Sequence, residues 1–124
     1  MIKDFKKETN QLLKKVLQGI EDKKGHDIVC IHIGQNENSV SDYFVICHGT
    51  SKTQVEAIAD SVVEKVRVEA DQKPWHVEGY ENSEWILLDY VDVVVHVFDM
   101  TKRDFYKLEE LWGDSKIERI ETKY

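Results

Sequence analysis

The chain of 124 residues contains little proline and glycine, and it has no long run of apolar residues. One proline, six glycines and a hydrophobic content of 41% argue against global disorder, and the length suits one domain with one core. No apolar segment approaches the roughly 20 residues that a membrane helix requires. Residues 1–8 lack the apolar centre of a signal peptide, so we expect a cytoplasmic protein.

Cysteine and basic residues are also scarce. Cys30 and Cys47 both fall inside apolar strand-like runs, which predicts buried, reduced thiols; a disulfide would require the two strands to be neighbours in register. Lysine and arginine number 17 against 24 aspartates and glutamates, a formal net charge of −7. This balance argues against a protein that tracks nucleic-acid phosphates, which needs a basic face, and it suits a partner with a basic surface.

Apolar periodicity predicts eight elements in the order α-β-β-α-β-β-β-α. The clearest start signal is Ser51 with Gln54 three residues later, a capping box that opens a helix with an apolar stripe. Thr101 is expected to cap the last helix and Gly113 to stop it. The predicted helices span residues 2–20, 51–66 and 101–113, and the predicted strands span residues 27–33, 43–47, 75–78, 85–88 and 93–98.

This order predicts a single-domain α/β fold over residues 1–113, a mixed β-sheet with helices packed on it. The helix that begins at Ser51 should be a right-handed crossover joining parallel strands, and the later strands should meander antiparallel. Residues 85–88 and 93–98 read as a β-hairpin. Its second strand is apolar on both faces apart from His96, so we expect it deep in the sheet. Residues 114–124 are expected to form a polar tail.

Catalytic motifs are weak. The turn Gly49-Thr50-Ser51 joins a strand to a helix, which leaves two interpretations open: plain helix capping, or binding of an anion such as phosphate. A Walker-type loop needs more glycine and a lysine at fixed spacing, and neither is present. Asp89 and Asp92 are three residues apart at a hairpin turn, where nothing obviously brings them together to hold the metal ions of phosphoryl transfer. The sequence therefore predicts no catalytic residue.

The five histidines do not form a metal signature. Cys30 with His32, and Cys47 with His48, lack the paired spacings of structural zinc sites. We expect His32 and His96 to be strand histidines with local hydrogen-bond partners, and whether His96 is structural or interfacial stays open. No serine, histidine and acid are ordered for hydrolysis. The sequence predicts no metal and no cofactor.

Aromatic side chains gather in the C-terminal half, where they are the best candidates for surface recognition. Trp112 lies on the apolar side of the last predicted helix, which favours a core position. Trp85 and Tyr90 bracket a strand of alternating faces, so one of the two should point away from the main core. The full set is Trp75, Tyr80, Trp85, Tyr90, Tyr106 and Trp112.

Two stretches resemble the ribosomal silencing factor family, also called the Iojap family. One is EWILLDYVDVVVHVFDMT at residues 84–101, continued by FYKLEELWG at residues 105–113, and the other is SDYFVICHGTS at residues 41–51. The resemblance covers roughly residues 24–113 and implies a nucleotidyltransferase-like fold. The alternative is a nucleotide-binding or nucleotidyltransferase-like enzyme of related fold.

The resemblance also implies partners and a site. It implies a homodimer that binds the large ribosomal subunit through its fourteenth protein, uL14, blocks association with the small subunit and so represses translation, with a further link to large-subunit assembly. Trp85 matches the family's proposed contact tryptophan, and Leu87 and Asp89 share its side of the strand. Other residues of the matched blocks complete the expected partner-binding set: Tyr90, His96 and Tyr106.

Val91 departs from the family, which commonly has glycine between the Asp-Tyr and Asp-Val elements. Because valine disfavours a positive φ, we expect the hairpin turn to use another geometry.

Overall fold

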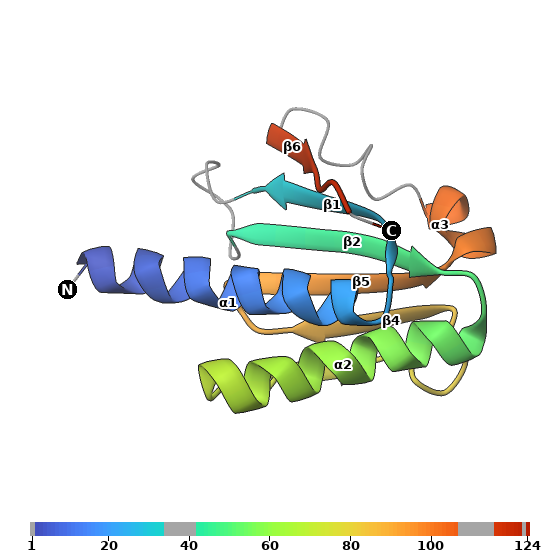
Figure 1. Cartoon of the computed structure of the whole chain (residues 1–124), viewed down its shortest axis with the longest axis horizontal. Coiled ribbons are helices and arrows are strands. Elements are labelled where there is room, and N and C mark those ends of the chain that lie inside the picture. The colour runs from blue at the N-terminus through green and yellow to red at the C-terminus, as the bar shows by residue number, and fades with distance from the viewer. Residues whose placement is uncertain (1, 34–41, 107–115, 123) are drawn as a thin grey trace.

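The fold is a six-stranded mixed sheet with two long helices on one face (Figure 1). The computed structural model describes residues 2–33, 42–106, 116–122 and 124, with side chains described from Glu8 onwards and, in the last helix, up to Arg103. No helix in these ranges is long and apolar enough to cross a membrane. The elements are α1 (Ile2–Asp22), β1 (His26–His32), β2 (Tyr43–Gly49), α2 (Lys52–Ala70), β3 (His76–Glu78), β4 (Trp85–Asp89), β5 (Val93–Asp99), α3 (Met100–Tyr106) and β6 (Lys116–Arg119).

The strands lie in the order β3-β4-β5-β2-β1-β6. β2 and β5 pair in parallel at the centre, and the other neighbours are antiparallel, including the β4–β5 hairpin that the sequence predicts. β3 runs parallel to β2, as expected for a crossover through α2, but β5 and β4 lie between them. Every residue of β5 before Asp99 is buried, which confirms the expected position deep in the sheet.

The main core lies between the sheet and the pair α1 and α2, which run side by side across one face (Figure 1). The two helices touch closely at Gly19: a Cβ there would lie 2.8 Å from Cα of Val62. At the same contact the Ser61 hydroxyl donates to the Gly19 carbonyl over 2.7 Å. Glycine is therefore required where the helix backbones meet.

A second, smaller apolar cluster lies on the sheet face away from α1 and α2. Alternation along a strand sends neighbouring side chains to opposite faces, so the central strands contribute to both clusters. The members of the second cluster are Val29, Ile31, Ile33, Ile46 and Phe98, with the half-buried Phe44 and Trp85 packed against them.

The two predicted helix caps have different outcomes. Ser51 caps α2 as predicted, with its side chain accepting from the backbone N–H of Gln54 over 3.1 Å. Thr101 does not cap α3, because the helix begins at Met100 and Asp99 accepts from both the N–H and the hydroxyl of Thr101 at 3.0 Å. α3 is described to Tyr106, so the predicted continuation through Leu108, Leu111 and Trp112 to Gly113 lies outside the described residues.

The prediction of a tail over residues 114–124 is wrong for part of that range. β6 pairs antiparallel with β1, and Ile117 stands opposite Ile31. Farther on, the Tyr124 hydroxyl donates to the carbonyl of Gly25 over 2.7 Å. All four residues of β6 are exposed, so the strand depends on backbone hydrogen bonds at the sheet edge and carries no apolar pattern that would reveal it.

Cys30 and Cys47 are buried free thiols, as the sequence predicts. Their strands are neighbours, but Cys30 stands opposite Val45, so the two cysteines are out of register for a disulfide. Burial raises the pKa of each thiol to about 12, with a smaller contribution from Glu118 at Cys30. Neither thiol is activated for chemistry.

Candidate partner-binding surface

The side chains of β4 alternate between the two faces of the sheet. Ile86 and Leu88 are fully buried in the main core, whereas Trp85, Leu87 and Asp89 are half-buried on the opposite face. The shared side predicted for Trp85, Leu87 and Asp89 is therefore present, and it faces away from α1 and α2.

Four aromatic rings from three strands form a layer on this face, which we call the aromatic face: Phe44, Trp85, His96 and Phe98. Trp85 stacks on Phe98 with ring centroids 5.1 Å apart, and its indole Nε1 donates to Nδ1 of His96 over 3.0 Å. Phe44 meets the His96 ring edge-on at 4.9 Å. The stacking and the hydrogen bond together fix the orientation of the Trp85 indole.

His96 is a buried, neutral imidazole. Its ring is only 4% exposed, and burial lowers its pKa to about 4. Because Nδ1 accepts from Trp85, the proton of the neutral ring is on Nε2. Among the described residues that buried Nε2 has no hydrogen-bond partner. His96 therefore has a local partner at one nitrogen only, which partly confirms the expectation from sequence.

The turn between β4 and β5 differs from the expected geometry. Val91 has φ +74°, although valine disfavours this region. The N–H of Asp92 donates to the carbonyl of Tyr90 over 2.9 Å, the hydrogen bond of a γ-turn centred on Val91. Asp89 accepts from the Val91 N–H over 2.7 Å. These bonds hold the valine at a positive φ that glycine would adopt with less strain.

Neither Tyr90 nor Tyr106 can be assigned to the aromatic face. Tyr90 is 5% exposed and belongs to the main core on the helix side, and burial raises the pKa of its hydroxyl to about 12. One of Trp85 and Tyr90 thus points away from the main core, as predicted, and it is Trp85. Tyr106 is the last residue of α3, and its side chain lies outside the described part.

The geometry does not support the catalytic, anion-binding or metal-binding alternatives. Asp92 accepts from the Thr9 hydroxyl of α1 over 3.3 Å, whereas Asp89 caps the turn from the other face, so the two carboxylates do not converge. At the start of α2, Gln54 accepts from the Thr50 N–H over 2.7 Å, which favours helix capping over anion binding. The described residues contain no group of three potential metal ligands.

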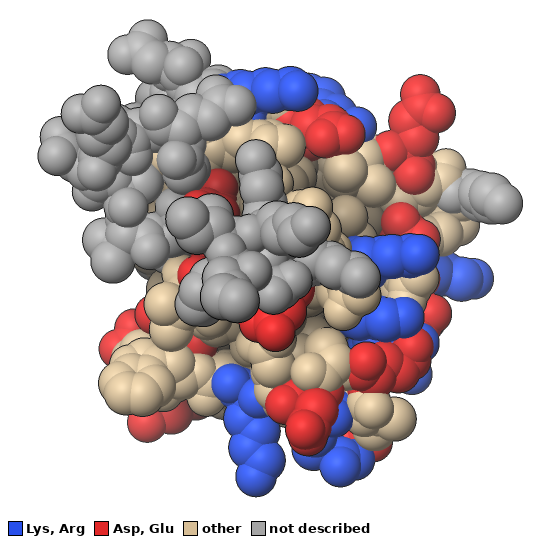
Figure 2. Space-filling model, turned by 90° about the vertical axis from the view of Figure 1, so that its left-hand side faces the viewer, with Lys and Arg blue, Asp and Glu red and all other residues tan. Residues whose placement is uncertain are grey.

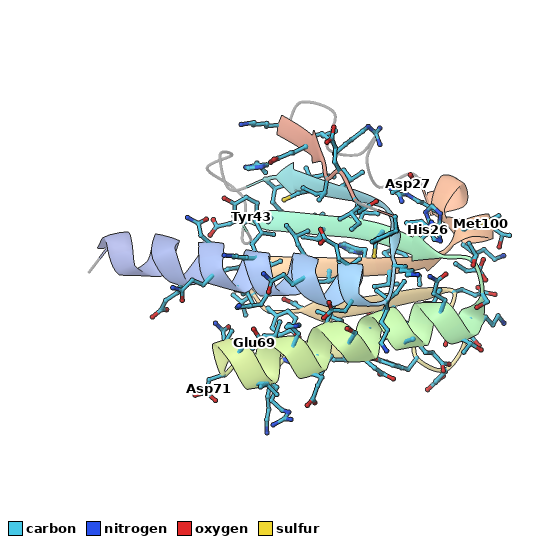
Figure 3. All side chains as sticks on the ribbon, viewed as in Figure 1. His26, Asp27, Tyr43, Glu69, Asp71 and Met100 are labelled. Carbon is cyan, nitrogen blue, oxygen red and sulfur yellow. The ribbon has the colours of Figure 1, made fainter. Side chains whose placement is uncertain are left out.

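A buried arginine is the feature that sequence reasoning missed. Arg103 of α3 is 9% exposed, and its Nη1 lies 2.9 Å from Nδ1 of His48 and 3.4 Å from the carbonyl of His26. The His26 and His48 rings stack at 5.4 Å, and Figure 3 shows His26 and Asp27 beside the start of α3 near Met100. The cluster ties α3 to the ends of β1 and β2.

Comparison with known proteins decides the family. A model of the family described as ribosomal silencing factor during starvation matches residues 6–123. The chain belongs to the ribosomal silencing factor family. Ribosomal silencing factor RsfS of Halalkalibacterium halodurans is 40% identical over 111 residues, covering 90% of this chain and 93% of its own. RsfS of Bacillus subtilis is 39% identical over 109 residues, covering 86% and 88%.

The fold agrees with this membership. A crystal structure of a Chromobacterium violaceum protein superposes with a TM-score of 0.79 at 38% identity, covering 84% of this chain and 85% of that protein. Ribosomal silencing factors are not enzymes, so the prediction that this chain is non-enzymatic is confirmed. The family match also includes β6, beyond the residues 24–113 that carry the resemblance in sequence.

Proposed function

We propose that this protein binds the large ribosomal subunit through uL14, blocks association with the small subunit and thereby represses translation in the cytoplasm. Family membership over residues 6–123 is the observation that carries the proposal. The proposal includes a homodimer, as the resemblance implies. The proposal also includes a contribution to large-subunit assembly, as the same resemblance implies.

The aromatic face and its margin supply the chemistry for such a contact. The Trp85 N–H is occupied by His96, so the indole offers a partner its apolar ring and no hydrogen bond. Leu87 adds apolar surface on the same side, and Asp89 adds a carboxylate at the end of the strand. A ring beside a carboxylate suits a basic partner, since the ring can also stack with a cation.

The overall charge favours the same kind of partner. The formal net charge is −7, and opposite fields steer two proteins together. Figure 2 shows the end of the molecule that carries the C-terminal end of α2, where basic and acidic side chains are interspersed. At this end of the molecule the described basic residues form no continuous stripe of the kind that tracks phosphates.

Co-sedimentation with purified large subunits, with small subunits as a second arm, tests the proposal. We expect the wild-type protein to pellet with large subunits only and to reduce subunit joining measured by light scattering. Trp85→Ala should weaken the binding about thirtyfold, the effect of losing an interface anchor worth about 2 kcal/mol. An equilibrium binding assay with ATP and Mg²⁺ tests the alternative of a nucleotide-binding enzyme in parallel.

Two control variants separate binding from folding. Val68→Ala changes a residue of α2 that is 61% exposed and away from the aromatic face, and it should leave binding unchanged. Trp85→Phe retains a ring to stack on Phe98 and should lose less affinity than Trp85→Ala. Full binding by a stably folded Trp85→Ala protein would remove this residue from the interface, and absence of wild-type binding would overturn the function.

A further inference from the structure

β3 is an outer strand of the sheet, with β4 on one side and solvent on the other. All three of its residues, His76, Val77 and Glu78, are exposed. An open edge of this kind presents backbone groups that can pair with another strand. Trp75, immediately before the strand, is 81% exposed, which is unusual for the largest apolar side chain.

The hydrogen-bond pattern shows which groups face outward. The N–H of Asp99 donates to the carbonyl of Glu84, so alternation along β4 turns the backbone groups of Leu87 and Asp89 toward β3. The bond from the Trp75 N–H to the Asp89 carbonyl, 2.7 Å long, agrees with this. Glu78 and His76 stand opposite these two residues, so Val77 between them directs its N–H and C=O away from the sheet.

The side chains of β3 are complementary to those of a second, antiparallel β3. With a twofold axis at Val77, His76 of each copy lies opposite Glu78 of the other. The two side chains already share one face within a chain, where Nε2 of His76 lies 3.0 Å from Oε1 of Glu78. Directly opposed residues in such a pair have Cα atoms about 4.5–5.5 Å apart, close enough for these side chains to interact.

The flanking residues fit the same axis. Trp75 of one copy lies beside Gly79 of the other, which has no side chain, and an aromatic ring can cover such a glycine. The opposite edge strand, β6, is less suited, because three of its four side chains are charged and Glu118 already contacts His32 at 3.5 Å.

We propose that two copies of this chain join through antiparallel pairing of their β3 strands, with the two Val77 residues exchanging backbone hydrogen bonds across a twofold axis. This inference rests on the homodimer proposed above and names its interface. His76 and Glu78 lie on the same face as Asp89 and Leu87, which stand opposite them. The pairing therefore places the Trp85-bearing faces of the two copies on one continuous sheet surface.

Analytical ultracentrifugation of the full-length protein over a range of concentrations tests the interface. Val77→Pro removes the outward N–H from both copies while leaving the His76 and Glu78 bonds to β4 in place. We expect the wild-type protein to form a dimer of two 14.5 kDa chains and Val77→Pro to dissociate about thirtyfold more readily. Val77→Thr keeps the N–H and is the matched control, which should remain dimeric.

A charge exchange gives a second test that does not depend on proline. His76→Glu places carboxylates opposite Glu78 in both halves of the interface and should weaken the dimer, and adding Glu78→His should restore it. Unchanged dimerisation of both Val77→Pro and His76→Glu would overturn the β3 interface while leaving the homodimer intact. A wild-type protein that stays at 14.5 kDa at high concentration would overturn both the homodimer and this inference. Binding to the large subunit is tested independently, by the co-sedimentation experiment above.

Discussion

Trp85 and His96 form a diagonal pair across the β4–β5 hairpin: Trp85 stands opposite Phe98 and Leu87 opposite His96, yet the indole N–H of Trp85 reaches Nδ1 of His96. The ring therefore spans two positions of the neighbouring strand, stacking on one residue and bonding to the next. This arrangement makes the orientation of the proposed anchor depend on a residue that is itself 4% exposed.

Replacing His96 with phenylalanine should release the Trp85 indole. The N–H loses its acceptor, which costs about 1–3 kcal/mol of folding free energy if it stays buried, and the ring gains freedom. We expect faster solvent exchange of the Trp85 indole proton in NMR spectra, a lower denaturation midpoint and weaker large-subunit binding. His96→Gln offers a carbonyl acceptor and should retain slower exchange. Equal exchange rates in wild type and His96→Phe would contradict the positioning role.

The buried imidazole should make stability sensitive to mild acid. The pKa of His96 is about 4 in the folded protein and about 6.5 in an unfolded chain, so the unfolded state takes up the proton first as pH falls. The stability from the neutral ring is thus present above pH 6.5, declines from there, and is fully lost below pH 4, a total of roughly 3 kcal/mol. Urea unfolding from pH 7.5 to 5 follows the first part of this decline in the free energy of unfolding. His96→Gln should flatten the decline, and a variant curve parallel to wild type would refute the assignment.

The turn at Val91 should be relieved by glycine. A β-branched residue at φ +74° is strained, and glycine reaches this region without the Cβ clash. We expect Val91→Gly to raise the free energy of unfolding by about 1 kcal/mol after the entropy gained by the unfolded chain is subtracted. Val68→Gly is the matched control: this valine is also exposed but helical, so glycine should lower stability there. Destabilisation by both changes would contradict strain at the turn.

Arg103 should anchor α3. Replacing the buried guanidinium with methionine removes its bonds to His48 and to the His26 carbonyl, and hydrogen bonds of a charged group contribute about 1.5–3 kcal/mol. We expect a lower melting temperature and faster backbone hydrogen exchange in α3. Arg67→Met, which removes an exposed arginine bonded to Glu64, should change stability by no more than about 0.5 kcal/mol. Unaltered exchange in α3 would show that other contacts hold the helix.

Local patterns predicted those parts of the fold that local forces determine. The Ser51 cap, the alternation of β4 and the burial of β5 follow from spacing within a few residues. Asp99 and Thr101 are both residue types that favour the N-cap position. The start of α3 depends on where β5 ends, and the pairing of Asp99 with Gly49 sets that end.

Contacts between residues distant in sequence determine the features that local patterns do not predict. Arg103 and His48 are 55 residues apart, and no spacing rule links them. β6 is held by the edge of β1 and carries no apolar alternation of its own. The γ-turn at Val91 was missed because propensity disfavours it, whereas the hydrogen bonds around it hold the backbone there. Of the predicted site, the sequence placed Trp85, Leu87 and Asp89 together, but only the packing of the hairpin turn placed Tyr90 in the core.

The parallel pairing of β2 with β5 has a consequence for how the chain acquires its structure. These central strands are separated by α2, β3 and β4, so the middle of the sheet cannot form until residue 99 has been synthesised. The β1–β2 pair alone would expose its apolar residues on both faces. Because the β2–β5 pairing joins strands distant in sequence, it slows folding. Small single domains fold in an all-or-none transition, so we expect a fragment ending before β5 to populate no native-like state.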